Sequence, residues 1–86
     1  MSKPKHREDV MEREVGDEKM IYDPAHKNVH VISETAFFVW QRCDGQHSVE
    51  DIAAEAAAEY GAAAEDVRPD IDRCIAQFKE LSLLES

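Results

Sequence analysis

The sequence is short of basic residues. Ten of its 86 residues are Lys or Arg and nineteen are Asp or Glu, so the formal net charge at pH 7 is −9. Proteins that bind nucleic acids depend on Lys and Arg to displace counterions from the phosphates. The charge balance therefore argues against a nucleic-acid partner.

Long hydrophobic runs are also absent. No apolar stretch approaches the roughly 18 residues that a membrane-spanning helix needs, and residues 1–7 lack the apolar segment of a signal peptide. We expect a cytoplasmic protein that does not bind membranes. Its length suits one domain, and a chain this short buries only roughly 60–65% of its unfolded surface. A binding surface is therefore expected rather than a deep catalytic pocket.

Cysteines and catalytic motifs are scarce. Cys43 and Cys74 lie too far apart in the sequence for a CxxC redox or zinc motif, and we expect both to be reduced, buried thiols. The chain has no Gly-rich phosphate loop, nucleophile elbow or HExxH motif. The four histidines fall in the predicted lead-in, a turn, a strand and a loop, so no two of them share a predicted helix: His6, His26, His30 and His47. We expect no enzyme activity, no metal site and no cofactor.

A hydrophobic fraction of 43% indicates a folded domain. Residues 1–9 are polar, carry Pro4 and have no apolar periodicity, which predicts a flexible lead-in to a domain over 10–86. Gly16-Asp17 and Asp23-Pro24 are typical turn dipeptides. Before, between and after these turns, β-friendly residues predict three short antiparallel strands, at about 10–15, 19–23 and 28–32.

Helical patterns follow the strands. Ser33 and Ser48 are suitable N-caps, the second in a capping box with Asp51. Pro69 cannot donate a hydrogen bond inside a helix, so we place the start of the third helix at Asp66, which puts Pro69 in the first turn. The predicted helices cover about 34–43, 49–60 and 67–82. The predicted fold class is α+β, a three-stranded antiparallel meander followed by three α-helices.

The chain resembles the PqqD-like family in this order of elements and in a set of residues with characteristic spacings. The resemblance extends over nearly the whole chain from about Arg13 onward. Its residues are Tyr22-Asp23-Pro24, the run Asn28 to Ala36, Trp40, Cys43-Asp44-Gly45, Ser48-Val49, Ile52, Tyr60-Gly61 and Leu81 to Leu84.

The resemblance implies a winged-helix-like fold and a RiPP recognition element. Such domains bind the leader of a ribosomally made precursor peptide and present it to a modifying enzyme, here expected to be a radical SAM enzyme. The leader would add as a further strand to the edge of strand 28–32 and enter the groove between that strand and the third helix. An exposed strand edge has unpaired N–H and C=O groups suited to this task.

The resemblance makes both walls of the groove candidate contacts for a leader peptide. We expect Val29, Val31 and Ile32 to belong partly to the core, and His30 either to have a solvated tip or to contact the leader. Arg73 and Gln77 flank the apolar stripe of the third helix, where they either meet the leader or form an exposed polar face. Cys74 and Phe78 have core periodicity, and either is a candidate for the groove floor. The candidate leader-binding residues are Asn28, Val29, His30, Val31, Ile32, Arg73, Cys74, Gln77 and Phe78.

Phe37 and Phe38 form an adjacent aromatic pair on the first helix. At 100° per residue, Phe38 points almost opposite the predicted buried stripe of Ala36 and Trp40. The pair is therefore a candidate contact for the modifying enzyme or a second copy, and the chain is expected to be a monomer or a homodimer.

Two other functions are compatible with the predicted fold. A winged helix can bind DNA through a recognition helix, but Ser48 to Asp72 contains eight acidic residues and only one basic residue, Arg68. A scaffold subunit of a maturase, with no peptide ligand of its own, is the other alternative. A precursor gene beside a maturase gene would favour leader binding.

Overall fold

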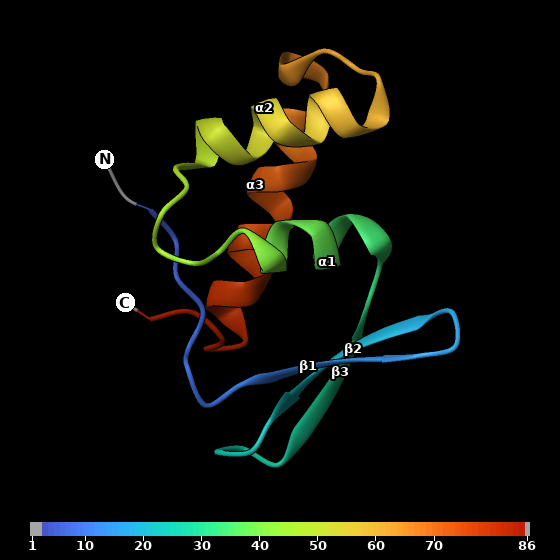
Figure 1. Ribbon diagram of the computed structural model, residues 1–86. Helices are drawn as coiled ribbons and strands as arrows, with labels where there is room; N and C mark the ends of the chain where they lie inside the picture. Colours follow the sequence, from blue (N-terminus) through green and yellow to red (C-terminus); the bar gives the residue numbers. More distant parts are fainter. Residues whose placement is uncertain (1–2, 86) are drawn as a thin grey trace.

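A computed structural model describes residues 3–85. Three strands are followed by three helices, as predicted (Figure 1). The elements are β1 (Met11–Val15), β2 (Glu18–Asp23), β3 (Asn28–Ile32), α1 (Glu34–Gln41), α2 (Val49–Tyr60) and α3 (Ala64–Glu80). The predicted α+β, winged-helix-like class is confirmed. β3 and α2 have the predicted bounds, while α1 ends two residues before the predicted position.

The strands form one antiparallel sheet in the order β1-β2-β3. Val15 pairs with Glu18 across the two-residue turn Gly16-Asp17, and Gly16 has a φ of 60°. Positive φ costs glycine little, so the turn gives the β1–β2 hairpin a defined register. The helices lie on one side of the sheet (Figure 1).

Trp40 lies at the centre of the hydrophobic core. Its side chain is 1% exposed, and its ring meets Phe78 of α3 edge-on at a centroid distance of 5.3 Å. Ile21 of β2 and Ile52 of α2 are fully buried in the same cluster. Cys43 is buried there as predicted, and desolvation raises the pKa of its thiol to about 12. The core thus joins the sheet to all three helices.

The structure corrects the predicted start of the third helix. α3 begins at Ala64 rather than after Asp66, and Pro69 lies inside it. Pro69 cannot donate a hydrogen bond to the carbonyl of Glu65. Because Glu65 is exposed, solvent can reach that carbonyl, and the missing bond does not end the helix. α2 follows the prediction, with both hydrogen bonds of the Ser48–Asp51 capping box present.

Residues 3–9 also differ from the expected flexible lead-in, because they lie against the domain. The N–H of His6 donates to the carbonyl of Cys43 at 2.8 Å, and the N–H of Arg7 donates to that of Leu83 at 2.9 Å. The His6 ring stacks on Trp40 at 4.6 Å. These contacts are long-range, so the local polarity of the segment gave no sign of them. Residues 1 and 2 lie outside the described part of the chain.

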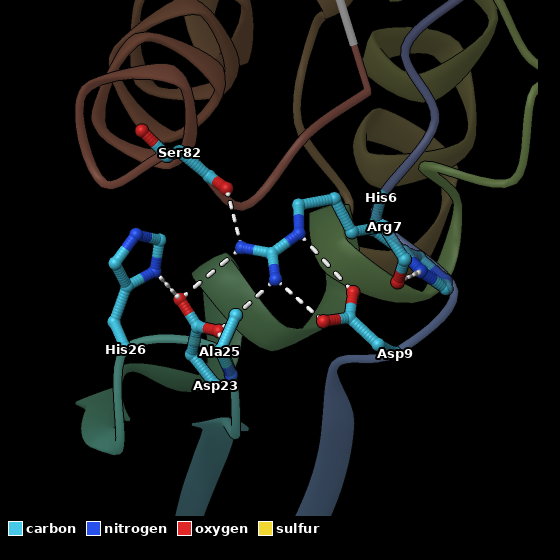
Figure 2. A network of polar contacts seen from close by, with 7 residues as sticks. All are labelled: His6, Arg7, Asp9, Asp23, Ala25, His26 and Ser82. Carbon is cyan, nitrogen blue, oxygen red and sulfur yellow. Dashed lines mark hydrogen bonds and ion pairs between the residues drawn. The ribbon is translucent and has the colours of Figure 1, made fainter.

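A polar network holds this segment to the sheet (Figure 2). Asp23 is 1% exposed, and each of its carboxylate oxygens accepts a hydrogen bond from Arg7 at 3.2 Å, while Nδ1 of His26 lies 2.7 Å from Oδ2. Arg7 also binds Asp9 and donates to the carbonyl of Ser82. The hydrogen bond with His26 is the main cause that lowers the pKa of Asp23 to about 2. The buried Asp23 carboxylate therefore links the N-terminal segment to the β2–β3 turn, and Arg7 extends the network to the chain after α3.

Candidate functional site: a strand edge beside a cavity on α3

β3 has one free edge. It pairs with β2 from Asn28 to Ile32, and no other segment within residues 3–85 pairs with it. Each unpaired edge carries N–H and C=O groups that can bind another extended chain. Five residues span about 17 Å, enough for several ladder hydrogen bonds.

Side chains alternate along β3 between the two faces of the sheet. His30 and Ile32 are half-buried on the inner face, where His30 pairs with the fully buried Ile21. Val29 and Val31 are 58% and 64% exposed on the outer face. The expectation that the core includes part of β3 therefore holds for Ile32 and is wrong for Val29 and Val31. The cause is that all three helices of residues 3–85 lie on the inner face of the sheet (Figure 1).

A shallow open cavity of about 250 Å³ lies between the chain just after β3 and the middle of α3. Three of the predicted helix residues line it, namely Arg73, Cys74 and Gln77. The i, i+1 and i+4 spacing of these residues places them on one side of α3. Ser33, Thr35 and Asp70 complete the lining. Cavity and strand edge are therefore adjacent, since Ser33 directly follows β3.

The lining of this cavity combines polar and apolar surface and is close to electrically neutral. The Arg73 side chain is 75% exposed, and its guanidinium forms an ion pair with Asp70. Cys74 is half-buried, and desolvation raises the pKa of its thiol, with a further rise from Asp70. The thiol is therefore protonated at neutral pH and forms a weakly polar wall. The cavity suits a neutral or mixed polar and apolar side chain better than an isolated charge.

The structure buries two of the three aromatic candidates, Phe78 in the core as its periodicity predicts and Phe37 against the sheet. Phe78 is 1% exposed and belongs to the core, so it does not reach the cavity surface. Phe37 is 5% exposed, and the Nζ of Lys19 of β2 lies 5.3 Å from the centroid of the Phe37 ring. Phe38 is half-buried, with the Arg42 guanidinium 3.6 Å from its ring centroid. Phe37 is therefore buried and does not offer its ring as a partner contact, and Phe38 is only partly accessible.

Sequence reasoning missed Thr35 and gave Ser33 and Asp70 other roles. Thr35 is half-buried in the first turn of α1 and lines the cavity. The available signal was the direct connection from β3 to α1, which brings the first turn of α1 near any ligand on the β3 edge. Asp70 lies one helical turn before Arg73, a spacing typical of an ion pair.

Neither a metal site nor a membrane-spanning segment appears in the part of the chain that the structure describes. No group of three or more His, Cys, Asp or Glu side chains within residues 3–85 is arranged to hold a metal ion. Over the same residues, no helix combines the length and apolar character needed to cross a membrane.

Known structures with bound leader peptides share this fold. TbiB1 in complex with the TbiA(beta) leader peptide is 18% identical, with a TM-score of 0.81 and coverage of 95% of both chains. Lasso peptide synthetase B1 complexed with the leader peptide is 20% identical, with a TM-score of 0.83 and coverage of 99% of this chain and 100% of that one.

A third similar structure is the solution NMR structure of the PqqD truncation of Methylobacterium extorquens PqqCD, described as a functional, stand-alone RiPP recognition element. It is 21% identical, with a TM-score of 0.81 and coverage of 96% of this chain and 88% of that chain. A search of curated protein sequences gives no significant match. The family profile of coenzyme PQQ synthesis protein D (PqqD) matches residues 18–84, and the chain belongs to this family.

Proposed function

We propose that this chain is a RiPP recognition element, which binds the leader of a ribosomally made precursor peptide and presents it to a modifying enzyme. The observation that carries the proposal is the free edge of β3 beside the cavity on α3. Membership of the PqqD family and the leader peptides in two similar structures support it.

In the proposed mechanism, the leader adds antiparallel or parallel to β3 and extends the sheet by one strand. Each ladder hydrogen bond contributes roughly 0.5–1.5 kcal/mol net, and ordering the free leader offsets part of this gain. Backbone pairing alone is nearly independent of sequence. Selectivity then comes from a leader side chain that enters the cavity beside Cys74, within reach of Arg73 and Gln77.

The chain itself has a binding role in this proposal, and the chemistry belongs to its partner. We propose a radical SAM enzyme as the modifying enzyme and the cytoplasm as the compartment. Binding leader and enzyme together would raise the local concentration of the precursor at the enzyme, as expected for linked binding sites.

Calorimetric titration of the chain with a synthetic leader tests the proposal. The leader is taken from the precursor encoded beside the gene for this chain, and a scrambled leader of equal composition is the control. We expect saturable binding of the native leader and a large loss of affinity for the scrambled one. Equal affinity for both, or no binding of either, would contradict the proposal and favour a scaffold without a peptide ligand.

A further inference from the structure

The outer face of the sheet is an exposed and largely apolar surface. Ile21 is fully buried on the inner face, so the alternation of side chains assigns its neighbours in the strand to the opposite face. Val29, Val31, Val15 and Met11 are 58%, 64%, 60% and 44% exposed there. The outer face consists of Met11, Arg13, Val15, Glu18, Met20, Tyr22, Val29 and Val31.

The strand register arranges these side chains in rows across the sheet. One row is Met11, Tyr22 and Val29, and the next is Arg13, Met20 and Val31. The last row contains Val15 and Glu18. Met20 therefore lies at the centre of the outer face, and the two charged residues lie beside it, Arg13 across the sheet and Glu18 along the strand.

We propose that the outer face binds the outer face of a second copy of this chain, with the strands of the two sheets crossing at about 90°. The two-fold axis runs along the diagonal of the face through Val15, Met20 and Val29. Rotation about this axis places each of these residues against its own counterpart.

The same rotation pairs the remaining residues of the face, except Met11, with residues of the second copy. Arg13 meets Glu18 of the second copy, and Tyr22 meets Val31 of the second copy. Spacings of about 4.8 Å between strands and about 6.8 Å per two residues along a strand differ by only 2 Å. The long side chains of Arg13 and Glu18 can span that difference.

Other two-fold arrangements of the same face are poorer. An axis parallel to the strands places Glu18 against Glu18, and an axis perpendicular to the strands places Arg13 against Arg13. The second diagonal places Arg13 on Tyr22 and Glu18 on Val31. Both charged side chains are exposed, and within residues 3–85 neither forms an ion pair. Charge complementarity thus selects one arrangement.

The size of the face predicts a reversible dimer. Three strands of five residues measure about 14 Å by 17 Å. The area of this face is therefore well below the roughly 800 Å² per partner that a standard interface buries. The net charge of −9 on each copy opposes association, but salt screens it beyond about 8 Å at physiological ionic strength. The free hydrogen-bonding edge of β3 stays outside this interface, so its N–H and C=O groups remain available to a peptide in the dimer.

Sedimentation velocity of the chain alone, from about 10 μM to about 1 mM at physiological salt, tests this inference. We expect a concentration-dependent equilibrium between monomer and dimer. Arg13→Glu and Glu18→Arg each place like charges together and should raise the dissociation constant at least about tenfold. The double variant R13E/E18R restores the pair, keeps the net charge of −9 and should recover the dimer.

Glu80→Arg is the matched control, because it changes the net charge as Glu18→Arg does but lies on α3. It should leave the dimer at least as stable as in the unmodified chain. A monomer at every concentration would overturn the inference and leave the outer face for the modifying enzyme. Failure of the double variant to recover the dimer, with native circular dichroism, would overturn it as well.

Discussion

Filling the cavity beside β3 should block the leader without unfolding the domain. Cys74 is half-buried and its side chain lines the cavity of about 250 Å³, so the ring introduced by Cys74→Phe extends into open space rather than into the core. One buried apolar side chain contributes about 1.5–3 kcal/mol to binding. Losing the leader side chain that fills the cavity should therefore raise the dissociation constant roughly 10- to 150-fold.

Calorimetric titration with the native leader measures this change, and thermal unfolding shows whether the variant stays folded. Ala76→Phe is the control, since Ala76 is exposed on the same helix and does not line the cavity. It adds the same ring and should leave leader affinity unchanged. Full affinity of Cys74→Phe, or an equal loss in both variants, would refute the assignment of the cavity as the selectivity site.

Three further predictions concern charge and stability. Arg73→Glu should weaken leader binding by about 3- to 10-fold in the same titration, since an exposed pair contributes little; Arg68→Glu, also on α3, should not change it, and equal effects would remove Arg73 from the site. The lowered pKa of Asp23 means that its carboxylate stabilises the fold above about pH 4, and this contribution is lost as the pH falls towards 2. Asp23→Asn should therefore lower the Tm at pH 7 and reduce the drop in Tm across that acid range; an unchanged acid profile would show that Asp23 does not control it. Ser48→Ala removes the cap of α2 and should cost about 1 kcal/mol, seen as a Tm lower by about 4–8 °C, whereas an unchanged Tm would show that the cap is dispensable.

Local signals in the sequence were sufficient for the elements whose ends depend on nearby residues. The capping box of Ser48 defines the start of α2, and Gly61, with a φ of 64°, follows its end. The start of α3 was predicted wrongly because the argument from Pro69 was purely local. The exposed first turns of α3 tolerate the missing hydrogen bond, and exposure depends on the tertiary fold.

The candidate site was only partly accessible to sequence reasoning. Arg73, Cys74 and Gln77, three of the candidate contacts on the third helix, line one cavity beside β3. Which face of β3 is covered depends on where the helices lie, so Val29 and Val31 were misplaced. Phe37 is buried because β2 passes beneath α1, a contact between segments far apart along the chain.

The central claim is that a leader peptide binds along β3 and over the cavity on α3. Titration of ¹⁵N-labelled chain with the native leader, followed by ¹H–¹⁵N correlation NMR, tests it residue by residue. We expect the largest shifts to cluster on Asn28–Ile32 and on α3 around Arg73–Gln77. Saturable binding with the largest shifts on α2 or on β1, and none along β3, would contradict the claim.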